Sequence, residues 1–299
     1  MLPRKQNYLN NKDILKEIHK SKITYSWFLS PEFESYDYIV RSLDEIPDAL
    51  RDTDEAPSPA KSARLKRLIN KTIDEAAEQG IKLKSDSTDI KYDDIKDTDV
   101  VFRLMTWGHI PEAPPALAKI KKGKKAIIQD DDDGPIITEY DEDLVEQPTK
   151  YVKVNFPPFE HYKLDEHGEL ICVGRSHWKG DLETGHFSID HGHTTRKLAT
   201  MYMKLCDRYA TRSNWRGYTY NDEMRSQALL QLAQIGLQFD ESKGQNPFAY
   251  YTTTINNSFT RVLQIEKRNQ HIRDDILEMN DLNPSFTRQN QNSWHNGDE

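Results

Sequence analysis

The sequence predicts a mainly α-helical protein with a three-helix bundle near its C-terminal end and a small α+β or partly disordered N-terminal and middle part. Apolar residues recur every three or four positions between residues 194 and 270, which is the period of helices that pack on one another. Short alternating runs, typical of strands, lie between residues 151 and 193. Only 36% of the 299 residues are hydrophobic and 30% are charged, so we expect part of the chain to lack a packed core.

This reading divides the chain into five segments. They are an N-terminal helix in residues 1–22, an insertion with linkers and charged loops in 23–150, a small β element in 151–193, a helical domain in 194–270 and a polar, mostly disordered tail in 271–299. In the first segment Asn10 or Asn11 can cap a helix that runs to about Lys22, because an asparagine side chain accepts hydrogen bonds from free amides of the first turn. The run TDEAPSPAKS is typical of a linker.

Two elements are expected after that linker. A helix from Ala63 to Gln79 should end at Gly80, since glycine is the usual residue just beyond a helix. A strand should follow from Val100 to Met105.

The β element contains three short strand-like runs. Residues 151–154 form the first, and His161–Leu164 and Leu170–Val173 flank a turn in which Gly168 can take a positive φ. We expect the last two runs to pair as a hairpin.

The helical domain is expected to hold three amphipathic helices. The first should span Arg196 to Arg212, with Thr194 or Thr195 as its N-cap. In the third, Asn246 is the N-cap and Pro247 occupies the first helical position. The expected apolar stripes are Leu198, Tyr202, Leu205 and Tyr209; Met224, Ala228, Leu232, Ile235 and Phe239; and Phe248, Tyr251, Ile255, Phe259 and Val262.

Charge is distributed unevenly along the chain. The whole chain carries a formal charge of −8, yet residues 196–273 contain twelve basic and six acidic residues. A basic module inside an acidic chain indicates contact with phosphate. The third helix carries a polar face opposite its apolar stripe, and hydroxyls, amides and guanidiniums on such a face can contact phosphates and base edges. The candidate DNA-binding residues are Tyr250, Thr253, Thr254, Asn257, Thr260, Arg261, Gln264 and Arg268. An ordinary solvated helix face remains the simpler alternative for this pattern.

Here the chain resembles a known family. The run GLQFDESKGQNPFAYYTTTINNSFTRVLQIEK is similar to the second region of bacterial sigma factors, and most closely to the late-promoter sigma factors of large tailed phages. The similarity consists of a helix ending in Phe239-Asp240, a Lys243-Gly244 turn and an Asn-Pro-x-Ala-Tyr helix start at residues 246–250. The Gly-Tyr-Thr link at 217–219 and the segment Asn7-Tyr8-Leu9-Asn10-Asn11-Lys12-Asp13 also match the phage type. Together these motifs cover about 95 residues.

The resemblance implies a sigma-like initiation factor that binds host RNA polymerase core and directs it to short AT-rich late promoter elements. It implies no enzymatic activity and no cofactor, and a cytoplasmic location in the infected host cell. The polymerase would be bound by Glu223, Gln227, Gln231 and Gln234. Thr253 and Thr254 stand where housekeeping sigma factors have a tryptophan pair, which puts autonomous strand melting in doubt. The tail, with Phe286 and Trp294 as apolar anchors, would contact the phage sliding clamp.

Two alternatives remain open at this point. Six histidines crowd into residues 161–193, with Cys172 and Asp190 among them, and could form the metal centre of an HNH-type endonuclease. Their spacing matches no metal-site template, so surface or hairpin histidines are the more economical interpretation and no metal is expected. The chain could also be a protein that only tethers polymerase. Its two cysteines are too few for a disulfide framework, and no run approaches the roughly 20 apolar residues that span a bilayer.

Overall fold

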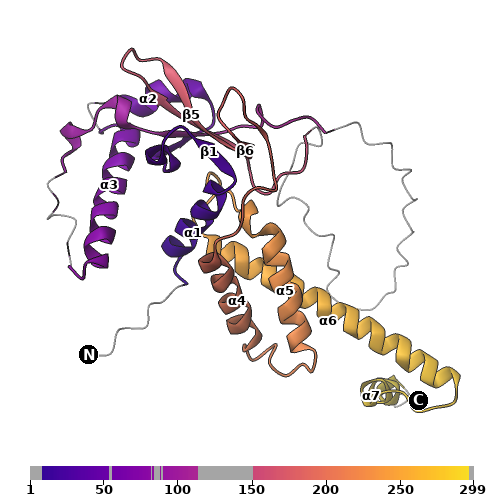
Figure 1. Ribbon diagram of the computed structural model, residues 1–299. Helices are drawn as coiled ribbons and strands as arrows, with labels where there is room; N and C mark the ends of the chain where they lie inside the picture. Colours follow the sequence, from indigo (N-terminus) through magenta and orange to yellow (C-terminus); the bar gives the residue numbers. More distant parts are fainter. Residues whose placement is uncertain are drawn as a thin grey trace. The chain divides into compact units, whose positions relative to one another are not determined.

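The computed structural model describes residues 9–53, 56–81, 83, 88, 90–113 and 151–295. The protein is mainly α, with about 51% of its residues in helices and a small mixed sheet. The chain forms two compact units (Figure 1). We call them the helical unit (the chain up to Ile18, Thr194–Phe239 and from Gly244 onward) and the sheet unit (His19–His193 and Asp240–Lys243). The charged loops expected in residues 114–150 lie outside the described residues.

The helical unit contains the expected three helices. They are α4 (Arg196–Ala210), α5 (Asn221–Ile235), continued by the 3-10 turn η7 (Gly236–Gln238), and α6 (Pro247–Met279), and they pack side by side (Figure 1). The first part of α1 (Asn11–Ile23) also belongs to this unit. The Thr195 side chain accepts a hydrogen bond from the Leu198 amide, so the predicted cap of α4 is confirmed. Asn10 caps α1 in the same way, through the Asp13 amide.

The apolar stripes form the core of this unit with two exceptions. All four residues predicted for α4 are buried, as are Tyr251, Ile255, Phe259 and Val262 of α6. Phe248 is exposed, so its assignment to the stripe is wrong, and Ile235 is only half-buried. Phe248 lies in the first turn of α6; its amide donates a hydrogen bond to Asn11 Oδ1, and its ring stays outside the core.

The prediction of a disordered tail after residue 270 is wrong for the described residues. The helix α6 continues to Met279, and α7 (Phe286–His295) follows it. The Asp274 carboxylate accepts hydrogen bonds from the Ser285 amide (2.8 Å) and hydroxyl (2.7 Å), and Arg288 forms ion pairs with Asp275 and Glu278. The polar composition of this stretch therefore reflects side chains that join α6 and α7 to each other.

The sheet unit is built on a five-stranded mixed sheet of strand order β1-β5-β4-β3-β2. The strands are β1 (Ser26–Phe28), β2 (Tyr38–Val40), β3 (Phe102–Met105), β4 (Phe159–Leu164) and β5 (Leu170–Ser176). Only β2 and β3 are parallel among these neighbours. The predicted β4–β5 hairpin is confirmed, with Leu164 opposite Leu170 and Gly168 at φ +84° in the turn. The pair β6 (Trp178–Lys179) and β7 (His186–Phe187) forms a second, small sheet.

Two further helices, of which the second is the longer, and several 3-10 turns complete the described part of this unit. They are α2 (Ile46–Leu50), α3 (Pro59–Glu78) and the 3-10 turns η1 (Pro31–Glu34), η2 (Leu43–Glu45), η4 (Tyr92–Asp94) and η5 (Asp97–Asp99). Phe102 and Leu104 of β3 share a buried apolar cluster with Val40 of β2 and residues of α2 and α3. Side chains alternate along a strand, so Arg103 between them points to the other face of the sheet.

Three expectations for this part of the chain need correction. The strands of residues 151–193 are not a separate β element, because β4 and β5 pair with β3 and β1 from the first half of the chain. Tyr151 forms an isolated bridge to Glu112, and residues 152–154 belong to no strand. The expected linker contains Ser58, which is buried and caps α3, so that helix begins at Pro59 and not at Ala63. The expected end of α3 before Gly80 (φ +80°) and the strand near Val100 are confirmed.

No helix among the described residues is both long enough and apolar enough to cross a membrane.

Candidate nucleic-acid interface

The start of α6 is fixed by two asparagine side chains. Asn246 Oδ1 accepts a hydrogen bond from the Ala249 amide at 3.1 Å, as the sequence predicts. Asn11 Oδ1, from the N-terminal segment of the same unit, accepts one from the Phe248 amide at 3.1 Å. The first amides of a helix have no partner within the helix, so each such cap stabilises this terminus. The contact with Asn11 could not be found from local sequence because 237 positions separate the two residues.

Two consecutive tyrosines bind the first turn of α6 to the end of α5. The Tyr250 hydroxyl donates to the Ile235 carbonyl (3.1 Å) and the Tyr251 hydroxyl to the Gly236 carbonyl (2.8 Å). A Cβ at Gly236 would lie 2.2 Å from the Tyr202 hydroxyl oxygen, so this position needs glycine. Carbonyls at the C-terminal end of a helix lack hydrogen-bond donors within the helix, and here the two tyrosine hydroxyls are the donors.

Tyr250 is therefore less accessible to a DNA base than its sequence position predicts. Its ring is half-buried and lies 5.7 Å from the Phe239 ring, and burial raises the pKa of Tyr250 to about 12. A base can stack only on the part of this ring that remains open.

The polar face of α6 lies beyond this first turn. Thr253, Asn257, Arg261, Gln264 and Arg268 are exposed, and Thr260 is half-buried. The exposure expected for Thr254 is wrong: only 5% of this residue is accessible, and its hydroxyl donates to the Tyr250 carbonyl. From Asn257 to Arg268 the spacing of four, three and four residues keeps the side chains on one side of the helix over roughly 16 Å. This α6 face (Asn257, Arg261, Gln264, Arg268) presents two amides and two guanidiniums and no carboxylate.

The predicted polymerase-binding face of α5 is only partly exposed. Glu223 and Gln234 are exposed, whereas Gln227 and Gln231 are half-buried. Leu230, which the sequence analysis did not single out, is 52% exposed. Since residues 223, 227, 230 and 234 are spaced by four, three and four, Leu230 lies in the middle of this face. An exposed leucine outside the core stripe is the signal that could have identified it.

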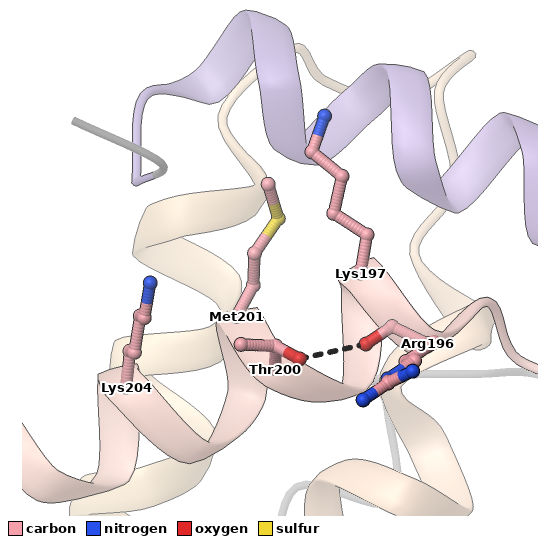
Figure 2. Close-up of a pocket in the computed structure, with 5 residues that line it drawn as sticks. All are labelled: Arg196, Lys197, Thr200, Met201 and Lys204. Atoms are coloured by element: carbon pink, nitrogen blue, oxygen red, sulfur yellow. Dashed lines mark hydrogen bonds between the residues drawn. The ribbon is translucent and has the colours of Figure 1, made fainter. Parts of the chain in front are cut away.

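A shallow pocket of about 420 Å³ lies on α4 and is lined by Arg196, Lys197, Thr200, Met201 and Lys204 (Figure 2). Lys197 and Met201 point to the same side of the helix, whereas Arg196 points away from them. Lys197 Nζ lies 3.3 Å from Glu17 Oε1, so its charge is already compensated. The Thr200 hydroxyl donates to the Arg196 carbonyl of its own helix. None of the candidate DNA-binding residues lines this pocket.

The histidines of residues 161–193 do not converge. His161 is buried on β4, where Nε2 accepts a hydrogen bond from Arg103 Nε at 3.0 Å and Nδ1 donates to the Phe33 carbonyl at 2.7 Å. His177 packs on the Phe156 ring at 4.0 Å between ring centroids. In the part of the chain that the structure describes, no three His, Cys, Asp or Glu side chains are grouped so that they could hold a metal ion.

In a second polar cluster the His109 ring lies between the side chains of Ser176 and Glu160. His109 Nε2 lies 3.3 Å from Ser176 Oγ, and His109 Nδ1 lies 3.6 Å from Glu160 Oε1. Ser176 is fully buried, and its hydroxyl accepts a hydrogen bond from the Phe159 amide. Burial lowers the pKa of His109 to about 4. A serine without access to a substrate cannot act as a nucleophile, so these groups connect β4 and β5 to the loop of His109.

Buried charge distinguishes the face of the sheet opposite the apolar cluster. The Arg103 guanidinium lies 3.8 Å from both the Tyr36 and Phe159 ring centroids and donates to His161. Lys22 Nζ lies 2.7 Å from Glu241 Oε2, and both side chains are largely buried. Burial alone would raise the pKa of Glu241, but the charges of Lys22 and Arg103 outweigh it and lower that pKa, so the carboxylate stays ionised. Glu241 belongs to the short loop that immediately precedes α6, which ties this loop to the sheet unit.

Comparisons with protein-family models, curated proteins and solved structures give no match for this chain.

Proposed function

We propose that this chain is a sigma-like transcription initiation factor, without catalytic activity of its own, that binds host RNA polymerase core and directs it to short AT-rich promoter elements. One observation carries the proposal: α6 has one side in the core of the helical unit and presents the α6 face, with its amides and guanidiniums, on the other. The motif order at residues 217–250 resembles that of phage late sigma factors, which supports the same assignment. In this proposal the three-helix arrangement corresponds to sigma region 2.

The α6 face suits DNA because its side chains can recognise different parts of it, both base edges and phosphates. An amide such as that of Asn257 can donate to and accept from an adenine edge at once, whereas Arg261 and Arg268 can contact phosphates or guanine. Tyr250 would contact an unpaired base only with its open edge, because its hydroxyl is engaged by Ile235. We therefore assign the main DNA contact to the exposed residues from Asn257 to Arg268.

Polymerase core would contact a different helix of the unit, α5. Glu223, Leu230 and Gln234 are the exposed members of that face, with the half-buried Gln227 and Gln231 beside them. A solvent-exposed leucine flanked by polar side chains suits a helical partner. The phage sliding clamp remains a further proposed partner through Phe286, which is 76% exposed; the side chain of Trp294 lies outside the described part of the chain.

Run-off transcription with purified core polymerase and a panel of AT-rich promoter elements tests the proposal. We expect the chain to give promoter-dependent transcripts that core alone does not produce. Arg261→Gln with Arg268→Gln should abolish these transcripts without weakening core binding, and Leu230→Glu should weaken core binding. Phe259→Ala, which removes a fully buried ring, should impair both activities, since such a loss costs about 3–5 kcal/mol. Core binding without any change in promoter choice would leave only a polymerase tether.

A further inference from the structure

The loop between α4 and α5 carries a concentration of positive charge that the proposed function does not use. Residues 208–220, which are the last turn of α4 and the loop, contain three arginines and no acidic residue; Asp207, Asp222 and Glu223 flank this stretch, and Arg225 pairs with the first two of them. Arg208, Arg212 and Arg216 are all exposed, and no described residue forms an ion pair with any of them. By contrast, Arg225 nearby on α5 lies 3.5 Å from Asp207 and 3.6 Å from Asp222. No described carboxylate therefore neutralises these three arginines, although the Arg212 guanidinium lies over the Tyr209 ring, so their charge can attract an external anion.

The loop is held in a defined conformation. The Asn221 side-chain amide donates to the carbonyls of Ala210 (3.1 Å) and Trp215 (2.9 Å), which closes the loop at both ends. The Trp215 and Arg216 amides donate to the Arg212 carbonyl, so a helix-like turn follows α4. Arg208 lies in the last turn of α4 and Arg216 in this turn, while the Arg212 guanidinium between them packs over the Tyr209 ring at 4.0 Å from its centroid.

Aromatic rings form a platform beside these arginines. Trp215 is buried against Phe259, with ring centroids 5.4 Å apart, and anchors the loop on the core. Tyr218 lies 6.2 Å from Trp215, and Tyr220 lies 5.2 Å from Tyr218. Both tyrosines are half-exposed, and neither hydroxyl has a hydrogen-bond partner among the described residues. The ring contacts with Trp215 and with each other hold the two tyrosines in place, and the exposed parts of their rings are accessible to a planar ligand.

We infer that this loop platform (Arg208, Arg212, Arg216, Tyr218, Tyr220) is a second nucleic-acid surface, specific for single strands. Arginines bind the phosphates of a strand, and aromatic rings bind its unpaired bases by stacking, which is why the two residue types occur together in single-strand sites. A duplex offers phosphates but no free base faces. An acidic protein would satisfy the arginines and leave the rings without a role. The inference goes beyond the proposed function, because it requires neither polymerase nor a promoter.

The test is a fluorescence-anisotropy titration of the full chain with labelled oligothymidylate of roughly 12 nucleotides, which spans a site of the usual size. We expect binding that is tighter than to a duplex of equal length. Tyr220→Ala should weaken it roughly 5- to 150-fold, the range for one stacked base, whereas Tyr220→Phe should retain it. Arg212→Gln with Arg216→Gln should lower the slope of log K against log salt by about 1.4, since each single-strand phosphate contact contributes about 0.7.

The matched control removes two charges elsewhere in the same unit. Arg225→Gln with Arg288→Gln changes net charge equally, but both arginines are already in ion pairs, so affinity should change by less than about threefold. Arg261→Gln with Arg268→Gln, measured in the same assay, separates the α6 face from the loop platform. Thermal unfolding of each variant verifies that the fold is intact. Failure of the wild type to bind oligothymidylate, or equal affinity of wild type and both loop variants, would overturn the inference.

Discussion

The helical unit and the sheet unit place their polar groups in opposite ways. In the helical unit the core of α4, α5 and α6 is aliphatic and aromatic, and most charged side chains lie on the surface; among the described residues, the carboxylates of Glu17 and Asp274 are the buried exceptions. In the sheet unit, Arg103, Lys22 and His161 are fully buried. A buried charge is stable only while its partners stay in place, whereas an exposed one is free to meet a ligand. In our proposal the helical unit carries the binding surfaces, whereas the stability of the sheet unit depends on its internal polar network.

The largest effect that would sharpen this comparison is acid unfolding of the sheet unit alone. Burial lowers the pKa of His19 and of His177 to about 3 and that of His109 to about 4, from 6.5, and lowers the pKa of His161 as well. Below pH 6.5 these histidines bind protons in the unfolded chain but not in the native one. The free energy of unfolding therefore decreases as the pH falls toward 4. At pH 5 each of these histidines should cost about 2 kcal/mol.

Hydrogen exchange measured by mass spectrometry at pH 7.5 and 5 resolves the two units. We expect peptides of β3, β4 and β5 to lose protection at the lower pH. Peptides of α5 and α6 serve as the control, since His271, the one histidine among the described side chains of the helical unit, is exposed. Equal loss of protection in both units would show that the buried histidines do not set the acid stability.

The second prediction compares a buried ion pair with an exposed one. Lys22→Met leaves the buried Glu241 carboxylate without its partner and should cost about 3–5 kcal/mol of unfolding free energy. Arg225→Met breaks the exposed pair with Asp207 and should cost less than about 1 kcal/mol. Urea unfolding followed by circular dichroism gives both values.

A compensating variant separates charge from packing in the buried pair. Lys22→Met with Glu241→Gln removes one positive and one negative charge, so the net charge of the network is unchanged. We expect it to recover at least half of the loss caused by Lys22→Met. If it recovers nothing, the shape of the lysine and not its charge holds this loop.

The smallest effect concerns the cap of α6. Asn246→Ala removes the acceptor for the Ala249 amide and should lower stability by about 1 kcal/mol, whereas Asn246→Ser should behave as wild type, because serine caps equally well. Differential scanning calorimetry measures the shift in Tm. An identical Tm for Asn246→Ala and wild type would mean that the Asn11 contact alone fixes this end of the helix.

The sequence predicts the helical unit well and the sheet unit poorly, for a physical reason. Helix caps and stripes such as Thr195 and Leu198–Tyr209 depend on residues three or four apart, so local spacing contains them. The pairing of β3 with β4 joins residues 58 positions apart, at Arg103 and His161, and the Lys22–Glu241 pair joins residues 219 positions apart. The spacing of neighbouring residues in the sequence contains no information about contacts between residues so far apart. For the same reason the α6 face could be predicted, whereas the contact between Tyr250 and Ile235 could not. Thr254 is different: it lies three residues after the buried Tyr251, so local spacing already indicates its burial.

Site-specific photocrosslinking tests the central claim, that the α6 face meets promoter DNA, most directly. A benzophenone amino acid placed at Asn257 should crosslink to promoter DNA in the presence of core polymerase. The same group at Lys71, a comparably exposed position on α3 of the sheet unit, should not crosslink. Crosslinks from position 257 that map to the promoter element, and none from position 71, are the predicted result. No crosslink from position 257, or equal yields from both positions, would contradict the assignment of α6 as the DNA-reading helix.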